Sequence, residues 1–140
     1  MMTRTDASAT DAHRSLGRRF FQEQDRLRGG PAEALCAPEY LAVLGGNPPM
    51  DRAGHEGFSL AFYGAFPDLR HEIQEVFATE DRVAVRFVLH GTHTGAFLGM
   101  PPTNRSITVA ANIILHVSDG RVTNLLAVFD EAGLMRQLGA

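Results

Sequence analysis

The sequence of 140 residues has one cysteine, no lysine and no tryptophan. The single thiol, Cys36, cannot form an intrachain disulfide or build a thiolate metal site. No apolar run approaches the ~20 residues that a membrane span requires. The polar segment 1–10 also lacks the apolar stretch of a secretory signal. We therefore expect a cytoplasmic protein that has no membrane partner.

Positive charge is scarce and scattered. The 13 basic residues are all arginines, and with 16 acidic residues they give a formal net charge of −3. Because nucleic-acid binding needs clustered positive charge, we expect no nucleic-acid partner. The apolar fraction of 44% and charged fraction of 21% are typical of a globular chain. The length suits a single domain over residues 11–140, after a flexible N-terminus at 1–10.

Helical signals dominate the first half of the chain. Apolar residues at helical spacing predict a helix from Asp11 to the glycine pair at 29–30. A short second helix over 31–36 and a strand over 40–44 follow. Asp51 is expected to cap another helix, which Pro67 ends. Three phenylalanines recur every fourth residue along it, and we interpret them as core that also walls a cavity: Phe58, Phe62 and Phe66.

Strand signals dominate the second half. Apolar and polar residues alternate over 69–79, 83–89, 105–117 and 122–129. Asp119-Gly120 is typical of a tight hairpin turn between the last two strands. A short closing helix over 134–138 completes the order. Because the helices come mainly first and the antiparallel strands last, the pattern predicts an α+β fold.

Asp130 stands at the junction between the last strand and the closing helix. A carboxylate there has two possible roles, helix capping and acid–base chemistry. Simple alternation along the strand puts it on the face of Leu126 and Val128, which we expect to line a pocket. His93 shares the face of Phe87 and can bind a substrate oxygen at the pocket mouth or serve a structural role.

The spacing of the histidines and acids matches no metal site, and we expect no metal. The glycine-rich stretch 91–99 lacks the spacing of a phosphate loop and opens no helix. The serines have no nucleophile-elbow context, and Cys36 has no evident base. We therefore expect no cofactor.

Several ordered motifs in the second half resemble the SnoaL-like polyketide cyclase family, within the superfamily of nuclear transport factor 2 and ketosteroid isomerase. The resemblance covers roughly residues 54–139. Its motifs are His55-Glu-Gly-Phe, Ala65-Phe-Pro-Asp-Leu69, Asp81-Arg-Val-Ala-Val-Arg-Phe87, Gly91-Thr-His-Thr-Gly95, Phe97-Leu-Gly-Met-Pro-Pro-Thr103, Asp119-Gly-Arg-Val122, Asp130, Gly133-Leu134 and Gln137-Leu-Gly139.

The resemblance implies a cone-shaped α+β barrel, in which a curved and mostly antiparallel sheet wraps around the N-terminal helices and leaves an apolar pocket. It also implies cofactor-free acid–base catalysis, and the family's catalytic aspartate falls on Asp130. Many relatives carry a Glu-His-Trp triplet where this chain has Asn124-Leu125-Leu126. That departure argues against an identical substrate.

We interpret the chain as a cofactor-independent acid–base enzyme acting on a small, apolar, polyketide-like carbonyl substrate, most simply an intramolecular aldol cyclase. Asp130 and His93 are the expected catalytic residues. The alternatives are an isomerase, dehydratase or cofactor-free hydroxylase with the same pocket, or a ligand-binding dimer without chemistry. The expected pocket residues are Phe20, Phe58, Phe62, Tyr63, Phe87, Leu126 and Val128.

We also expect a homodimer or higher homo-oligomer. The last two strands are apolar on both faces, and a bare outer face would expose a large apolar patch. On the same alternation, this outer face is expected to carry Ile114, Leu125, Ala127 and Phe129.

Overall fold

The computed structural model of the chain describes residues 4–140. Three α-helices and five strands follow in the order α1 (Arg4–Leu27), β1 (Cys36–Leu44), α2 (Arg52–Ala65), β2 (Arg70–Ala78), β3 (Arg82–Thr92), β4 (Ser106–Ser118), β5 (Arg121–Phe129) and α3 (Glu131–Gln137). A single 3₁₀ turn, η1 (Glu33–Leu35), stands where the short second helix was predicted. Within the described residues, no helix is both long and apolar enough to cross a membrane.

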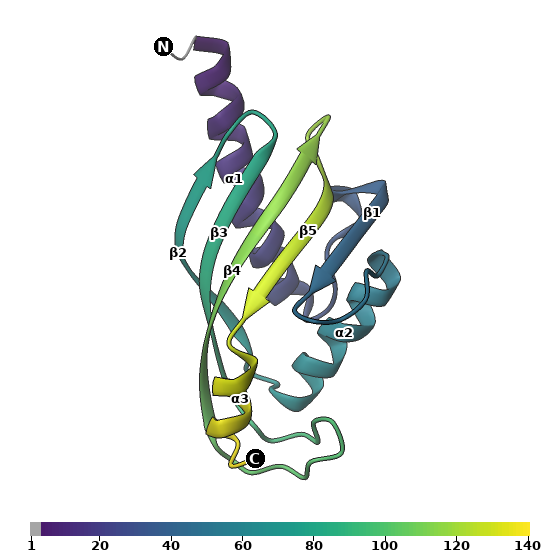
Figure 1. The fold of residues 1–140 in the computed structure, drawn as a ribbon, viewed down its shortest axis with the longest axis vertical. Coiled ribbons are helices and arrows are strands. Elements are labelled where there is room, and N and C mark those ends of the chain that lie inside the picture. The colour runs from purple at the N-terminus through teal and green to yellow at the C-terminus, as the bar shows by residue number, and fades with distance from the viewer. Residues whose placement is uncertain (1–3) are drawn as a thin grey trace.

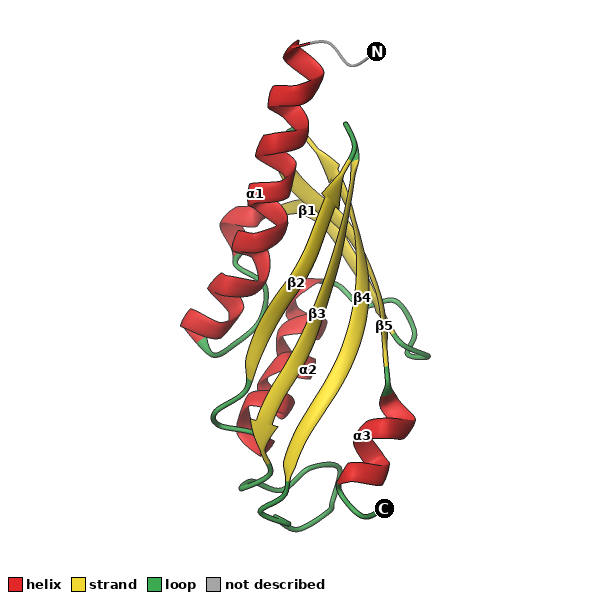
Figure 2. Ribbon diagram, turned by 90° about the vertical axis from the view of Figure 1, so that its left-hand side faces the viewer, coloured by secondary structure: helices red, strands yellow, loops and turns green. Residues whose placement is uncertain are grey.

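The five strands form one sheet in the order β1-β5-β4-β3-β2. Every neighbouring pair is antiparallel except β1 and β5, which run parallel. The sheet curves, with α1 behind it in the view of Figure 1 and beside it in Figure 2, while its other face carries no long helix. The predicted α+β architecture with a mostly antiparallel sheet is confirmed.

The first helix begins earlier than the sequence predicted. Helical structure starts at Arg4 rather than Asp11, so most of the segment expected to be flexible continues α1. Residues 1–3 of that segment lie outside the described residues. The buried face of α1 carries Leu16, Phe20 and Phe21, which pack on Val83 and Val85 of β3 and on their neighbours.

A β-bulge in β5 decides which of its side chains face the core. His116 of β4 pairs with Asn124, but Val117 pairs with Val122, so Thr123 is an extra residue in β5. One inserted residue exchanges the two faces of a strand. Leu125 and Ala127 consequently face the core, and Phe129 joins them there in part, while Leu126 and Val128 lie outside.

The faces predicted for β5 were therefore wrong. Leu126 is 41% exposed and Val128 is 71% exposed, so neither lines a pocket. The alternation used for the prediction ran without interruption through Thr123. A bulge leaves no clear signal in the alternation of an apolar strand, because both faces of β5 carry apolar residues.

The loop after β3 packs its backbone directly on the end of α2. The N–H groups of Thr94 and Gly95 both donate to the carbonyl of Ala65, at 3.1 and 3.0 Å. A Cβ added at Gly95 would lie 2.1 Å from the carbonyl oxygen of Gly64. Only glycine fits this approach of two backbones.

We therefore predict that Gly95→Ala destabilises the protein by about 1–3 kcal/mol, because the new methyl group must displace backbone rather than a flexible side chain. The matched control is Gly57→Ala in α2, where an added Cβ meets nothing within 4 Å. That change should stabilise the helix by about 0.5–1 kcal/mol. Urea denaturation measures both, and equal stabilities of the two variants would contradict the backbone contact.

Candidate active site

A cavity of about 80 Å³ lies between the curved sheet and the two long helices. Aromatic and aliphatic side chains make most of its wall, and a few polar residues interrupt them. The lining residues are Phe21 and Gln24 of α1; His55, Phe58, Ser59, Phe62 and Tyr63 of α2; and Leu44, Leu69, His71, Phe87, Leu89, Ala111, Ile113, Leu125, Ala127 and Phe129 from the strands and their ends.

Four of the expected pocket residues lie in this wall: Phe58, Phe62, Tyr63 and Phe87. Phe20 does not, although it is fully buried, because it packs in the core against Phe21 and Tyr40, with ring centroids 5.2 and 6.3 Å away. The neighbouring Phe21 takes the cavity position instead. Phe20 is thus a wrong pocket prediction, as Leu126 and Val128 are. For Phe20 the reason is the direction in which that position of α1 faces.

Asp130 lies outside the cavity wall. Its side chain is exposed and accepts a hydrogen bond from the backbone N–H of Gly133 at 2.9 Å, which makes it the N-cap of α3. The preceding residue, Phe129, is the last one of β5 in the wall. The geometry thus shows the capping role, and a catalytic role for Asp130 stays a prediction.

His93 also lies outside the cavity wall, although it is fully buried. The backbone N–H of Thr103 donates to its Nδ1 at 3.2 Å, and the Thr103 hydroxyl lies 2.9 Å from the same atom. The backbone of His93 bonds to Arg105 and Asn104. These contacts join the two ends of the 93–105 loop, so the geometry shows a structural role, while the predicted catalytic role is untested.

Sequence reasoning missed a pair at the cavity: His71 of β2, which lines the wall, and Asp25 of α1, which binds His71 from outside the wall. One carboxylate oxygen of Asp25 lies 2.8 Å from the imidazole Nδ1, and the other accepts from the backbone N–H of His71 at 2.8 Å. The Tyr63 hydroxyl donates to the first oxygen at 2.7 Å. The imidazole packs against Phe21 and Phe87, with centroids at 5.4 and 4.6 Å.

The protonation of this pair follows from its contacts. Burial acts to raise the pKa of Asp25, but the hydrogen bonds from His71 and Tyr63 and the charge of His71 in its protonated form outweigh it, and the net shift is downward. An ionised carboxylate can only accept, so Nδ1 of His71 must donate. In the neutral ring, Nε2 then carries a lone pair, which is the form of a general base.

A second histidine of the wall, His55 of α2, has the opposite tautomer. Its Nδ1 lies 2.8 Å from the hydroxyl of Tyr40, and the two rings are nearly parallel, 6° apart. Burial raises the pKa of Tyr40, so its hydroxyl keeps its proton. Within residues 4–140, the acceptor for the Tyr40 hydroxyl proton is Nδ1 of His55. Tyr40 therefore donates, and the proton of the neutral imidazole lies on Nε2.

The charge state of His55 is set by its surroundings. Burial, and to a smaller degree repulsion from a protonated His71, lowers the pKa of His55 to about 4. His55 is consequently neutral near pH 7 and offers an Nε2–H donor. The wall thus combines an imidazole acceptor, an imidazole donor and apolar rings, which is an arrangement suited to removing a proton next to a carbonyl and holding the resulting oxyanion.

No local motif identifies these residues in the sequence. Asp25 and His71 are 46 residues apart and come from a helix and a strand that only the fold brings together. Among the described residues there is no group of three or more metal-ligating side chains. Cys36 is buried, and burial raises the pKa of its thiol to about 11.

Comparison with known proteins identifies the family of the chain. The family model described as SnoaL-like polyketide cyclase matches residues 16–138. Aklanonic acid methyl ester cyclase AcmA of Streptomyces galilaeus is 39% identical over 59 residues, a match that spans 42% of this chain and 41% of that enzyme.

Solved structures agree with this placement. A SnoaL-like protein from Jannaschia sp. CCS1 superimposes with a TM-score of 0.81 over 94% of both chains, at 20% identity, and shows the same fold. IdmH of Streptomyces antibioticus, a candidate polyketide cyclase, has a TM-score of 0.73 and 29% identity over 93% of this chain and 97% of its own. AclR of S. galilaeus, a candidate hydroxylase, has a TM-score of 0.81 and 27% identity over 91% of this chain and 82% of its own. With its family model matched over most of its length, this chain belongs to the SnoaL-like polyketide cyclase family.

Proposed function

We propose that the protein is a cofactor-independent cyclase that closes a ring by an intramolecular aldol reaction, with His71 as the general base and His55 as the hydrogen-bond donor. The observation that carries the proposal is the 2.8 Å hydrogen bond between Asp25 and His71, an imidazole in the wall of an apolar cavity. Asp25 and Tyr40 act as positioning residues, because each holds one imidazole in a single tautomer.

The proposed reaction conserves every atom of the substrate. Nε2 of His71 takes a proton from the carbon next to a carbonyl, and the enolate oxygen accepts a hydrogen bond from Nε2–H of His55. The enolate carbon attacks a second carbonyl of the same molecule, which forms one carbon–carbon bond. The new alkoxide then takes the proton back from His71, so the product is an isomer of the substrate.

The family and the relative named as a cyclase of aklanonic acid methyl ester support a ring-closing reaction on a polyketide. A volume of about 80 Å³ is below the ~300–1,000 Å³ of typical small-molecule pockets. We therefore propose that only the reacting end of such a substrate enters the cavity. A second candidate function is hydroxylation, because AclR, a candidate hydroxylase, shares 27% identity and the fold.

We predict that the protein converts aklanonic acid methyl ester into a product of unchanged mass with a new ring, as measured by chromatography and mass spectrometry. The mass separates the candidate reactions. Hydroxylation adds one oxygen atom, and dehydration removes one water. A product with either mass would contradict the aldol proposal, as would recovery of unreacted ester together with no deuterium uptake next to its carbonyls in D₂O.

Variants assign the base in the same assay. His71→Gln should lower turnover by about 10²–10⁴-fold, because Gln cannot transfer the proton. The matched control is His90→Gln on β3, outside the cavity wall, which should turn over like the wild type. Asp130→Asn should also stay active, since Asn caps a helix as well as Asp. A hundredfold loss for Asp130→Asn with active His71→Gln would move the acid–base role to Asp130.

The neutral state of His55 has a consequence for stability. Its folded pKa of about 4 lies below the ordinary value of 6.5, so the unfolded chain binds the proton more readily. The contribution to stability is therefore complete above pH 6.5 and is lost as the pH falls toward 4.

We predict that the free energy of unfolding falls by up to about 3 kcal/mol across this window because of His55 alone. Urea denaturation at several pH values should show that His55→Gln removes most of this dependence. The glutamine can still accept a hydrogen bond from Tyr40. If the free energy of unfolding depends on pH equally in the wild type and in His55→Gln, His55 is not held neutral by burial.

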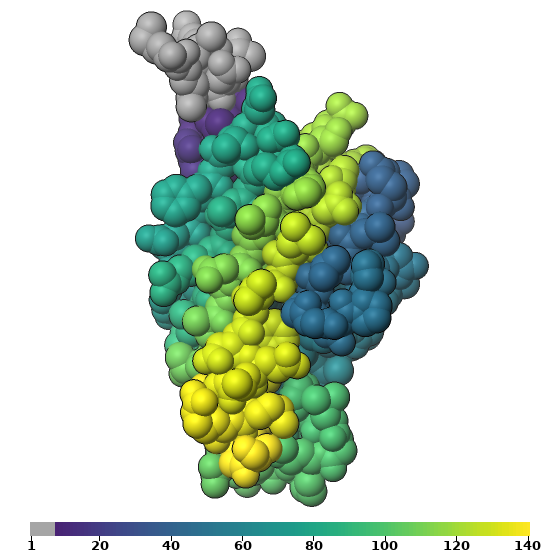
Figure 3. Space-filling model, viewed as in Figure 1, coloured from purple at the N-terminus to yellow at the C-terminus, as the bar shows by residue number. Residues whose placement is uncertain are grey.

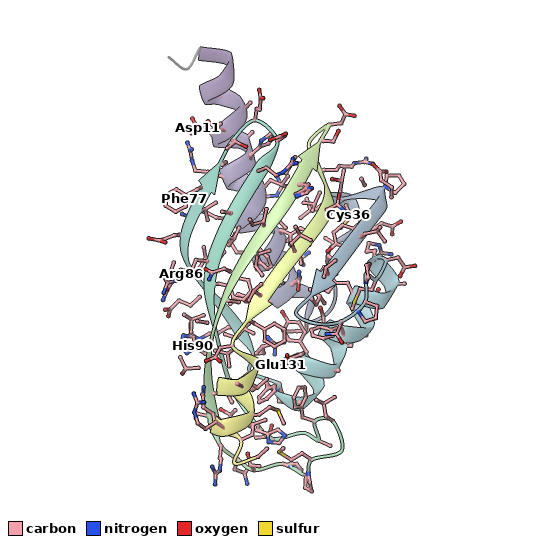
Figure 4. All side chains as sticks on the ribbon, in the orientation of Figure 1. Asp11, Cys36, Phe77, Arg86, His90 and Glu131 are labelled. Carbon is pink, nitrogen blue, oxygen red and sulfur yellow. The ribbon has the colours of Figure 1, made fainter. Side chains whose placement is uncertain are left out.

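We also propose that a second copy of the chain covers the outer face of the sheet. A row of apolar residues crosses four strands there through direct cross-strand pairs: Phe77 with Ala84, Ala84 with Ile114, and Ile114 with Leu126. Figure 3 shows this face with no helix across the middle strands, and Figure 4 marks Phe77 at the β2 edge. Phe77 is 66% exposed and Ile114 is 46% exposed. Of the outer residues expected from the sequence, only Ile114 lies here.

We predict a dimer mass for the wild type in light scattering at micromolar concentration and a monomer mass for Leu126→Glu, because a charge in the middle of an apolar interface is left without a partner. Leu60→Glu is the matched control, since Leu60 is a similarly exposed leucine on α2, and it should remain a dimer. A monomeric wild type would overturn the proposal.

A further inference from the structure

Gln24 is a polar residue of the cavity wall that the proposed chemistry does not use. It belongs to α1, is only 3% exposed and lies in the wall one turn beyond Phe20 and Phe21. Its Nε2 is buried and makes no hydrogen bond within the described part of the chain. Tyr63, His55 and His71, by contrast, each have a side-chain partner.

A buried amide group without a partner destabilises a protein, and an apolar residue of the same size would serve the core better. The terminal torsion of a glutamine side chain is soft, so the carboxamide can turn either its N–H or its carbonyl oxygen toward a bound molecule. The features of Gln24 are therefore those of a group whose partner arrives with the substrate.

The position of Gln24 separates it from the donor at His55. α1 packs on β2 and β3, whereas α2, which carries His55, packs on β1. Gln24 precedes Asp25 in the chain, so its backbone lies on the side of the cavity that holds the base, His71. Gln24 and His55 thus reach the cavity from different helices, so the wall can bind two substrate oxygens at once.

We infer that Gln24 is a specificity-determining residue, which binds a second oxygen of the substrate, either a carbonyl or a hydroxyl. The inference rests on the proposed function, which places the first oxygen, that of the enolate, at His55. The substrate is then an apolar molecule with oxygen functions on both sides of the carbon that loses its proton. A substrate with a single oxygen would leave the amide of Gln24 without a partner.

Binding of simple enol analogues tests this role without a catalytic assay. The probes are naphthols, which have one hydroxyl, and a panel of naphthalenediols, which have two at various spacings. At least one diol should bind the wild type about tenfold more tightly than either naphthol, because it gains one hydrogen bond. Gln24→Met should lose that preference and keep its affinity for the naphthols. Fluorescence titration measures the affinity of the wild type and of Gln24→Met for the naphthols and for the diols.

Gln22→Met is the matched control, because Gln22 is an exposed glutamine on the same helix, and its preference should equal that of the wild type. Urea denaturation should show Gln24→Met at least as stable as the wild type. A preference that survives in Gln24→Met, or no diol preference in the wild type, overturns the inference. If Gln24→Met loses as much affinity for the naphthols as for the diols, Gln24 binds the reacting oxygen, and the inference is overturned as well.

The two proposals fail separately. Full turnover by His71→Gln would remove the proposed base and leave the diol preference of Gln24 intact. An unchanged diol preference in Gln24→Met would remove the role of Gln24 and leave the loss of turnover in His71→Gln intact.

Discussion

The carboxylate of Asp25 is the interaction on which the cavity depends. It accepts hydrogen bonds from the side chain and backbone of His71 in β2 and from Tyr63 in α2, so it joins three elements at one point. Removing a carboxylate from water is costly unless it is fully paired. Three donors offset that cost here, and the downward shift in the pKa of Asp25 shows that they more than do so. The same contacts that hold α1 and α2 against the sheet also set the tautomer of His71.

The two histidines of the cavity wall differ because their hydrogen-bond partners differ. His71 faces a carboxylate, so its neutral ring has a lone pair on the other nitrogen, whereas His55 faces a phenol, so its neutral ring has a proton there. Neither assignment needs a metal ion or a charged substrate. Aromatic rings exclude water around both imidazoles, which strengthens any hydrogen bond formed to a bound molecule.

Membership of the SnoaL-like family accounts for the fold and leaves the reaction open, because the chemistry of a fold depends on the residues grafted on it. Asp130, the residue on which the family resemblance placed catalysis, caps a helix in this structure. The nearby Leu125 and the aromatic Phe129 make that part of the wall apolar. Polar groups instead enter the cavity from α1, α2 and β2. The family scaffold is thus compatible with polar groups that come from elements other than the junction of β5 and α3.

Local signals in the sequence were enough to predict the order and type of nearly all elements, namely helical spacing, strand alternation and the Asp119-Gly120 turn. It also identified the aromatic wall at Phe58 and Phe62, which repeat along one helix. The inner face of β5 could not be predicted in this way, because a bulge of one residue at Thr123 reverses the alternation without a distinctive residue pattern. Only the tertiary structure paired Asp25 with His71, because a contact over 46 residues depends on how a helix and a strand pack and not on their own sequences.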